Sequence, residues 1–352
     1  MVLVTGSMRS GTSSLAGSLK HLGWHVPQPE VPASSRNAKG HFEPRWAIEF
    51  HKRLLRGALV RPSDGSPRAE ERVTALLDDG TVEAELSEWL TAQAEPRIVV
   101  KDPHAAWVLP LWRRSAERAG RDLRILVALR HPAEVVGSQD ITWGEGRRTD
   151  AERRTKETSN TAAWLNVALV TERGSRDARR AFIRYDDLLT DWRGALRRVS
   201  DQLDLALPLD EERGLDEFLD PGMRRSQLTW SDIVLPDWLR EQAEATWRQL
   251  GALVEDPLDL AAPARLDAIR AAYAARYDEA VAISLDEARH RERRGSAAGA
   301  AKIRGRLKTE RARRKAAEAE LEANPGAGQS AKRALGQILG RSRPGNRDAT
   351  NS

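Results

Sequence analysis

A glycine-rich segment near the start of the chain has the composition and spacing of a phosphate-binding turn. Residues 6–14 read G-S-M-R-S-G-T-S-S, and we call them the phosphate loop. They follow an apolar run at residues 2–5 and precede a pattern of helical spacing. Between a strand and a helix, backbone N–H groups and the helix N-terminus can surround an anion. The loop is therefore predicted to bind a phosphate group through Arg9, Ser10, Gly11, Thr12 and Ser13.

The phosphate loop departs from the P-loop of nucleotide kinases at one informative position. Gly6 and Gly11 have the spacing of GxxxxGK[ST], but Thr12 stands where that pattern has lysine. Kinases need this lysine on the β- and γ-phosphates, together with Mg²⁺. A transfer in which a phosphate is the leaving group needs only a cation near the bridging oxygen, and Arg9 can supply it. The sequence therefore favours a metal-independent group transfer, with a P-loop nucleoside or small-molecule kinase as the alternative.

A second candidate phosphate site follows the apolar run at residues 124–129. Arg130 leaves this run at the carboxyl edge of the predicted sheet, where open α/β folds bind ligands. If Pro132 starts the next helix, Ser138 lies about two turns along it. The planar guanidinium group suits a dianionic phosphate. We therefore expect both residues to bind phosphate. The alternatives are a surface ion pair for Arg130 and a hydroxyl exposed on a helix face for Ser138.

Taken together, these segments resemble the P-loop-like sulfotransferase superfamily, and most closely its bacterial, glycan-associated branch. The resemblance covers residues 1–219, weakens to about 285 and does not reach the end of the chain. It implies that the co-substrate is 3′-phosphoadenosine 5′-phosphosulfate (PAPS) and that no metal is required. It assigns the phosphate loop with Arg9 to the 5′-phosphosulfate, and Arg130 with Ser138 to the 3′-phosphate. The sulfuryl group would then move to a hydroxyl or amine of an acceptor, with a carbohydrate or lipid-linked glycan as the class suggested by this branch.

A base is needed because the acceptor must lose a proton during the transfer. Members of the superfamily use either a glutamate soon after the phosphate loop or a histidine near the second strand. By this resemblance Glu43 is the first choice, and His104, His41 and Asp102 are the alternatives. Lys101 is expected to stabilise charge on the transferring group, or else to pair with Asp102. The predicted catalytic residues are therefore Arg9, Glu43, Lys101 and His104.

Four short apolar runs, each followed by a helical pattern, predict the fold. Such alternation is typical of an α/β protein in which helices flank a parallel sheet in three layers. We expect four to five strands, within a sulfotransferase domain at residues 1–285 that carries helical inserts at about 45–95 and 140–180. Tyr185, in a motif shared with the superfamily, is expected to pack under the sheet. The runs are residues 2–5, 97–100, 124–129 and 181–185.

Composition excludes several other classes of site. The chain has no cysteine, so it can form neither a disulfide nor a thiolate metal site. His21 and His25 are four residues apart, but Gly23 lies between them and argues against a metal-binding helix, so no metal site is predicted. No apolar run reaches the ~18 residues of a membrane span, and the start of the chain lacks the pattern of a secretory signal. We expect a cytoplasmic protein.

The last part of the chain is basic and of low complexity. Residues 286–352 contain 17 Lys and Arg against 8 Asp and Glu, whereas the rest of the chain is slightly acidic. We expect a flexible, helical or disordered tail that contacts polyanions or an anionic membrane surface. A non-catalytic P-loop domain with a polyanion-binding tail is the second alternative function. Residues 221–225, P-G-M-R-R, are a further candidate for a loop that closes over a nucleotide.

Overall fold

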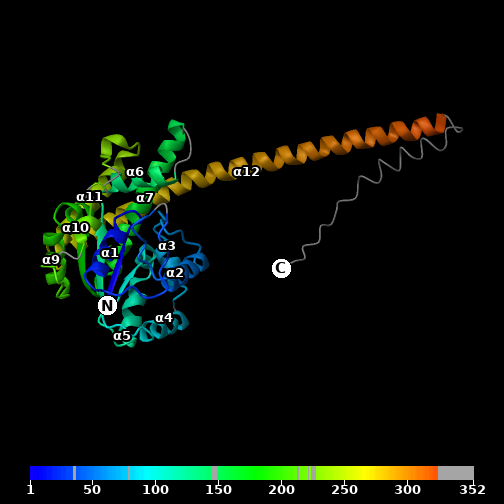
Figure 1. Cartoon of the computed structure of the whole chain (residues 1–352). Coiled ribbons are helices and arrows are strands. Elements are labelled where there is room, and N and C mark those ends of the chain that lie inside the picture. Colours follow the sequence, from blue (N-terminus) through cyan, green and yellow to red (C-terminus); the bar gives the residue numbers. More distant parts are fainter. Residues whose placement is uncertain are drawn as a thin grey trace. The chain divides into compact units, whose positions relative to one another are not determined.

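The computed structural model describes residues 1–34, 37–77, 80–143, 149–211, 214–220, 222 and 227–323. The chain divides into two compact units, Met1–Asp278 and Glu279–Ser352. Figure 1 colours the chain from its N-terminus to its C-terminus. All four strands belong to the first unit. The described part of the second unit is the end of helix α12, which spans Ala261–Ala323.

A four-stranded parallel sheet forms the centre of the first unit. Its strands lie in the order β2-β1-β3-β4. Gly6 of β1 lies opposite Ala128 of β3, and Val4 of β1 lies opposite Lys101 of β2. The carboxyl ends of these strands therefore meet at one edge of the sheet, beside the phosphate loop. The strands are β1 (Val2–Gly6), β2 (Val99–Lys101), β3 (Arg124–Leu129) and β4 (Arg179–Arg184).

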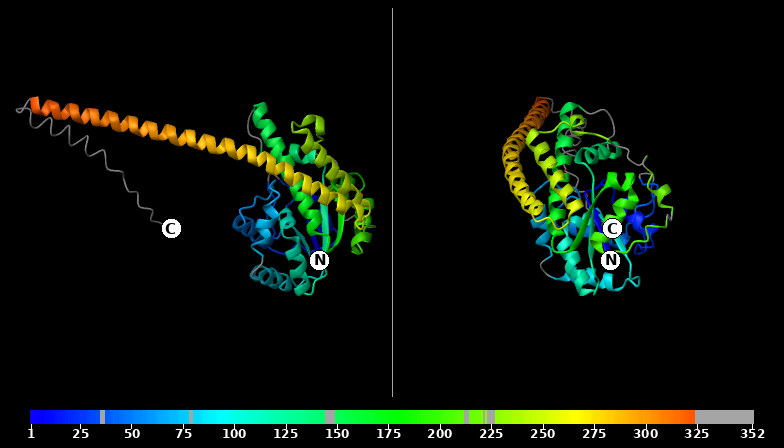
Figure 2. Two further views of the ribbon diagram at one scale, coloured as in Figure 1. Left: turned by 180° about the vertical axis from the view of Figure 1, so that it is seen from behind. Right: turned by 90° about the vertical axis from the view of Figure 1, so that its left-hand side faces the viewer.

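Both faces of the sheet are covered by helices. Successive side chains of a strand point to opposite faces, so Leu3 and Val4 belong to different buried clusters. The cluster that contains Leu3 is completed by α5 (Leu109–Arg118), α7 (Asp150–Gly174) and α11 (Asp237–Glu255). The cluster that contains Val4 is completed by α1 (Thr12–His21), α8 (Tyr185–Thr190) and α9 (Trp192–Leu203). Figure 2 shows helices on both sides of the strands, and the predicted three-layer α/β fold is confirmed.

Three strands differ in length from the runs that predicted them, β1 by a single added residue. β4 begins at Arg179 rather than at residue 181, and Tyr185 starts a helix instead of ending the strand. Arg180 is buried because its guanidinium group pairs with the buried Glu172 at 3.0 Å. Since a charged residue interrupts the apolar pattern, the start of β4 could not be recognised from hydropathy. β2 has only three residues, Val99–Lys101.

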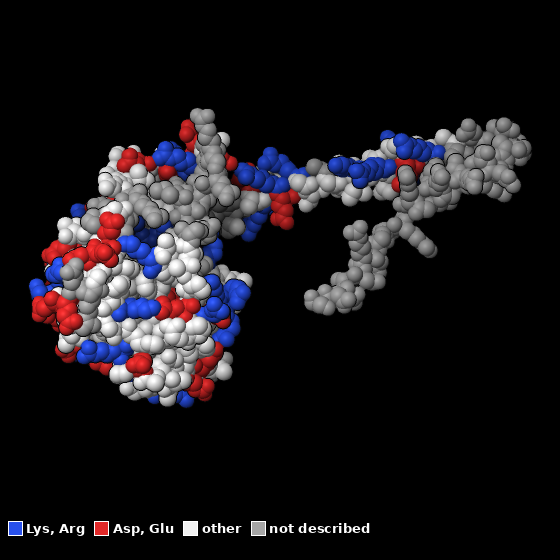
Figure 3. Space-filling model, viewed as in Figure 1, with Lys and Arg blue, Asp and Glu red and all other residues white. Residues whose placement is uncertain are grey.

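The remaining helices lie in the connections between strands and after β4. Among the described residues, the connection from β1 to β2 contains four α-helices, α1 to α4, and the connection from β3 to β4 contains two, α6 and α7. Within the described ranges, no helix is both long and apolar enough to cross a membrane. Figure 3 shows Lys and Arg side chains along the described part of α12. The further elements are α2 (Arg45–Gly57), α3 (Ala69–Thr74), α4 (Thr81–Thr91), η1 (Pro103–Trp107), α6 (Pro132–Trp143), α10 (Leu215–Phe218) and η3 (Trp230–Asp232).

Candidate functional site

The phosphate loop is shaped by backbone conformations that favour glycine. Gly6 and Gly11 have φ angles of 139° and 92°, and Arg9 has a φ of 70°. A Cβ atom on Gly6 would lie 2.5 Å from the carbonyl oxygen of Ala128. A Cβ atom on Gly11 would lie 2.2 Å from a ring carbon of Tyr185. Side chains at either glycine would therefore collide with neighbouring strands or helices, and the loop can close tightly only without them.

The phosphate loop includes the N-terminus of α1, and this end of the helix has no side-chain cap. Gly11 occupies the N-cap position, no side chain hydrogen-bonds there, and the first turn carries no acidic residue. The first N–H groups of a helix have no partner within the helix and carry partial positive charge. Thr12 and Ser13 supply two of these N–H groups, because they are the first residues of α1. This end of α1 is thus suited to an anion.

Ser10 forms hydrogen bonds within the phosphate loop. Its hydroxyl group donates to the carbonyl oxygen of Ser7 at 2.7 Å, and its backbone N–H donates to the same oxygen at 3.2 Å. Its side chain is fully buried. Both donors of Ser10 therefore stabilise the turn of the phosphate loop itself, although the sequence suggested that they face a phosphate.

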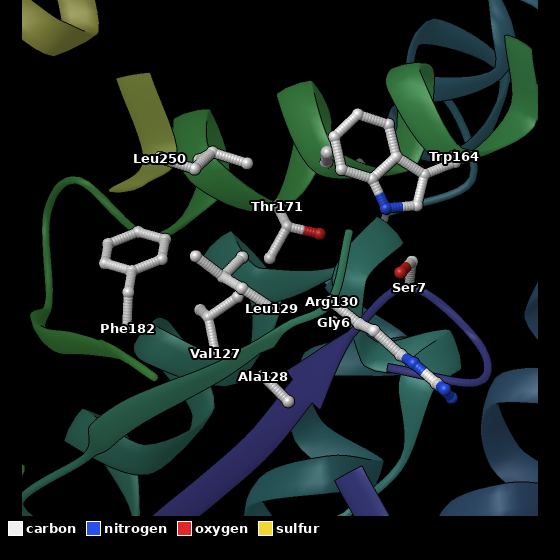
Figure 4. Close-up of a pocket in the computed structure, with 11 residues that line it drawn as sticks. Gly6, Ser7, Val127, Ala128, Leu129, Arg130, Trp164, Thr171, Phe182 and Leu250 are labelled. Atoms are coloured by element: carbon white, nitrogen blue, oxygen red, sulfur yellow. The ribbon is translucent and has the colours of Figure 1, made fainter. Parts of the chain in front are cut away.

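Arg9, Arg130 and Ser138 lie together beside the phosphate loop. Nε of Arg9 donates to Oγ of Ser138 at 3.1 Å. Nη1 of Arg130 donates to the carbonyl oxygen of Arg9 at 3.4 Å. α6 begins at Pro132, as the sequence predicted, and it carries Ser138 to this position. Figure 4 shows the Arg130 side chain leaving β3 next to the loop at Gly6 and Ser7. The two predicted phosphate sites are thus neighbours.

Arg130 is a buried side chain held by two neighbours. It is 7% exposed, and its Nε atom donates to a carboxylate oxygen of Glu134 at 2.9 Å. Its guanidinium carbon lies 5.0 Å from the ring centroid of Tyr185. This arrangement is not the surface ion pair that was the alternative. Glu134 was missed in the sequence, where the only signal was an acidic residue four positions after the arginine. Tyr185, expected only to pack under the sheet, contacts Arg130.

Lys101, which is buried, and Glu43, which is partly buried, form an ion pair next to the end of the phosphate loop. Nζ of Lys101 contacts a carboxylate oxygen of Glu43 and donates to Oγ of Ser13 at 3.2 Å. Asn37 donates to the same hydroxyl oxygen at 3.1 Å. Lys101 is 3% exposed. The predicted lysine therefore lies beside the loop, and its carboxylate partner is Glu43 rather than the adjacent Asp102.

Asp102 is a fully buried carboxylate that receives hydrogen bonds from two histidines. Nδ1 of His51 lies 2.7 Å from one of its oxygens. Nδ1 and the backbone N–H of His104 both contact the other oxygen, the N–H at 2.9 Å. Burial raises the pKa of Asp102, but the hydrogen bonds from His104 and His51 outweigh it and hold that pKa well below its usual range. Asp102 is thus ionised, and it fits the role of orienting His104 better than the role of base.

His41 lies near the Lys101–Glu43 pair. Its Nε2 atom is 2.9 Å from Oγ of Ser34. Burial lowers the pKa of His41, and Lys101 lowers it further, although Glu43 acts in the opposite direction. No carboxylate holds either ring nitrogen of His41 in the part of the chain that the structure describes. His41 is therefore less well oriented as a base than His104.

Two further features border the phosphate loop. A cavity of about 10 Å³ lies between the loop and α7, with Ser7, Arg130 and Thr171 in its lining. Such a volume holds about one water molecule, so this cavity is not a nucleotide pocket. Of the candidate closing loop, Gly222 is described, whereas Pro221, Met223, Arg224 and Arg225 lie outside the described residues.

Comparisons with known proteins identify the family of the chain. A sequence model described as "Sulfotransferase family" matches residues 2–209, whereas no curated protein matches the chain. Two solved structures are similar: the sulfotransferase domain of the Synechococcus PCC 7002 olefin synthase (17% identity, TM-score 0.42) and that of the curacin biosynthetic pathway (18% identity, TM-score 0.38). Each covers 71% of this chain, and this chain covers 94% and 97% of them, respectively. Since the family match takes in more than half of the residues, including the phosphate loop, Arg130 and Ser138, the chain belongs to the sulfotransferase family.

Proposed function

We propose that this sulfotransferase moves a sulfuryl group from PAPS to a hydroxyl or amine of an acceptor. The observation that carries the proposal is the meeting of Arg9, Ser138 and Arg130 at the carboxyl edge of β1 and β3. Ligands of open α/β sheets bind at this edge. Two guanidinium groups this close to an uncapped helix N-terminus suit a ligand with several anionic groups, as PAPS has.

The residues around the loop fit the two phosphate-bearing ends of PAPS. We assign the 5′-phosphosulfate to the backbone of the phosphate loop, the first turn of α1 and Arg9. We assign the 3′-phosphate to Arg130 and Ser138. Glu134 and the ring of Tyr185 hold the Arg130 guanidinium group in one orientation, and such preorganisation reduces the entropy lost on binding.

Arg9 and Lys101 are assigned to the charge that develops during the transfer. As the sulfur–oxygen bond to the phosphate breaks, the bridging oxygen of the leaving adenosine 3′,5′-bisphosphate gains negative charge. Preorganised cations at that position stabilise the transition state more than the ground state. Lys101 lies within hydrogen-bonding distance of Ser13, at the end of the loop, and can therefore act there beside Arg9.

We assign the role of general base to His104. The ionised carboxylate of Asp102 can only accept hydrogen bonds, so Nδ1 of His104, which contacts it, carries the proton. The lone pair of this neutral imidazole is then on Nε2, which is available to take the proton of the acceptor. Glu43, the first choice from the sequence, has the ammonium group of Lys101 as its partner. The geometry therefore favours His104 over Glu43.

Two measurements test the proposed function. Isotopically labelled PAPS should transfer its label to an acceptor pool, and we expect glycans or lipid-linked glycans to be labelled at a hydroxyl or amine. His104→Gln should lower kcat by about 10²–10⁴, the usual contribution of a general base, and by more than Glu43→Gln does. Stabilisation by ATP with Mg²⁺ but not by adenosine 3′,5′-bisphosphate would refute the choice of donor. A larger loss for Glu43→Gln would return the role of base to Glu43.

We also propose that the basic part of α12 contacts polyanions. Residues 288–315 contain 12 Lys and Arg and 2 Asp and Glu, and those with described side chains are exposed. Changing Arg311, Arg313 and Lys315 to Gln should reduce the salt dependence of binding to heparin, because each phosphate- or sulfate-neutralising side chain contributes about one unit to that slope. An unchanged slope would show that these residues make no such contact.

A further inference from the structure

A buried hydrogen-bond network of four side chains extends from the proposed base. Its members are His104, Asp102, His51 and Trp112. Nε1 of Trp112 donates to Nε2 of His51 at 2.8 Å. Nδ1 of His51 lies 2.7 Å from Oδ2 of Asp102, and Nδ1 of His104 contacts Oδ1 of the same carboxylate. Trp112 and Asp102 are fully buried, and His51 is 1% exposed. The four residues come from α5, α2, the end of β2 and η1, so the fold brings together residues distant in the sequence.

The donors and acceptors of this hydrogen-bond network fix the protonation state of His51. The indole N–H of Trp112 can only donate, so Nε2 of His51 must carry a lone pair. The carboxylate of Asp102 can only accept, so Nδ1 of His51 must carry the proton. His51 is therefore neutral, in the tautomer protonated at Nδ1. A cationic His51 would leave two N–H groups facing each other at the contact with Trp112.

A neutral His51 leaves the charge of Asp102 available to His104. When His104 takes the proton of the acceptor, its imidazolium lies against the carboxylate of Asp102, which contacts no other cation among the residues that the structure describes. We propose that His51, kept neutral by Trp112, is a positioning residue that fixes Asp102 so that this carboxylate orients and stabilises His104. This inference rests on the proposed function, because it assumes that His104 acts as the base.

Few other charged groups lie around this hydrogen-bond network. His104 and His51 are the charged or titratable groups that shift the pKa of Asp102. On the side of α2 and α5, His51 packs against the aromatic rings of Phe50 and Trp112. Lys101 precedes Asp102 in the chain, but its ammonium group faces Glu43 and Ser13. The contact with His51 is therefore the main polar contact of the Asp102 carboxylate besides its contacts with His104.

Three variants separate positioning from packing. His51→Phe removes the N–H that binds Asp102, whereas His51→Asn keeps a donor near the same position. Trp89→Phe is the control, because Trp89 packs edge-on against Trp112 and has no contact with the carboxylate. We expect His51→Phe to lower kcat about 10- to 100-fold, a part of the contribution of a general base, with the KM for PAPS nearly unchanged. His51→Asn should recover most of the loss, and Trp89→Phe should resemble the wild type.

The pH profile adds a readout that packing alone would not move. Without the N–H of His51, the carboxylate of Asp102 interacts more strongly with the protonated ring of His104. Since the base must be unprotonated, the acid limb of the kcat/KM profile should move to higher pH in His51→Phe. A wild-type kcat and profile in this variant, or a loss confined to the KM for PAPS, would overturn the inference.

Imidazole ¹⁵N spectra of the wild type and His51→Asn test the inference without any turnover. His51 should be protonated at Nδ1 and unprotonated at Nε2. A His51 ring that is protonated at both nitrogens would refute the inference even if sulfuryl transfer is observed. If His51 behaves as expected but the wild type transfers no sulfuryl group, the proposed function is wrong and the tautomer assignment stands.

Discussion

Replacing Arg130 should affect stability and donor binding together, because this residue is both buried and assigned to the 3′-phosphate. Its Nε atom lies 2.9 Å from Glu134, and the two side chains are 8% and 4% exposed. Arg130→Ala would leave the Glu134 carboxylate buried without its guanidinium partner. Removing one member of a buried ion pair typically costs about 3–5 kcal/mol. We expect the free energy of unfolding to fall by that amount, measured by urea unfolding.

A double variant separates the two effects. In Arg130→Met with Glu134→Gln no charge is left unpaired, so most of the lost stability should return. The affinity for adenosine 3′,5′-bisphosphate should stay low, because a hydrogen bond to a charged group contributes about 1.5–3 kcal/mol, or roughly 10- to 100-fold in Kd. Arg184→Ala is the control: Arg184 ends β4 and pairs with Glu255 at 3.3 Å, but is 32% exposed. Its loss should cost less than about 1 kcal/mol.

Two results would refute this reasoning. If the double variant binds the bisphosphate as tightly as the wild type, Arg130 does not hold the 3′-phosphate. If Arg130→Ala is no less stable than Arg184→Ala, the buried pair with Glu134 does not contribute as its burial implies. Calorimetric titration measures the first quantity and urea unfolding the second.

Three further predictions concern the loop and the half-buried His131. Gly11→Ala should lower the free energy of unfolding by at least about 1–2 kcal/mol because of the positive φ alone, and the collision with the Tyr185 ring should lower it further. The same variant should bind adenosine 3′,5′-bisphosphate more weakly. Thermal unfolding measures the first effect and calorimetry the second, and wild-type values would contradict the prediction. Arg9→Ala should lower kcat about 10²–10³-fold, as loss of one oxyanion-stabilising donor does, with an unchanged circular dichroism spectrum; an unchanged kcat at saturating PAPS would remove Arg9 from the chemistry. Burial lowers the pKa of His131 below its ordinary 6.5, so as the pH falls through 6.5 the unfolded state takes up more protons and stability declines. His131→Asn should flatten this decline in urea unfolding between about pH 7 and 5, and an equal slope in both proteins would show that His131 does not cause it.

Much of the fold could be predicted because its central strands are buried and uncharged. The bounds of β3 agree with the apolar run at residues 124–129, and β1 differs from its run by one residue. β4 was recognised two residues late because Arg179 and Arg180 stand at its start. Arg180 pairs with Glu172 of the preceding helix α7. The hydropathy of the strand segment alone contains no signal for this pairing.

The positions of Arg9, Arg130 and Ser138 were also accessible from the sequence. Carboxyl ends of parallel strands meet at one edge, so two motifs that follow two such strands must lie close together. The partners of these residues were not accessible. Glu134 is an ordinary acidic residue of a helix in the sequence, and His51 lies 51 positions before Asp102. Neighbouring residues of an extended segment point in opposite directions, which explains why Lys101 pairs with Glu43 instead of Asp102.

The central claim is that two arginines and the phosphate loop bind a bis-phosphorylated adenosine without a divalent metal. Calorimetric titration of the protein with adenosine 3′,5′-bisphosphate in the presence of EDTA tests it most directly. The account predicts binding at one site per chain, weakened about 10- to 100-fold by Arg130→Met with Glu134→Gln. No detectable binding by the wild type, or binding that appears only when Mg²⁺ is added, would contradict the account.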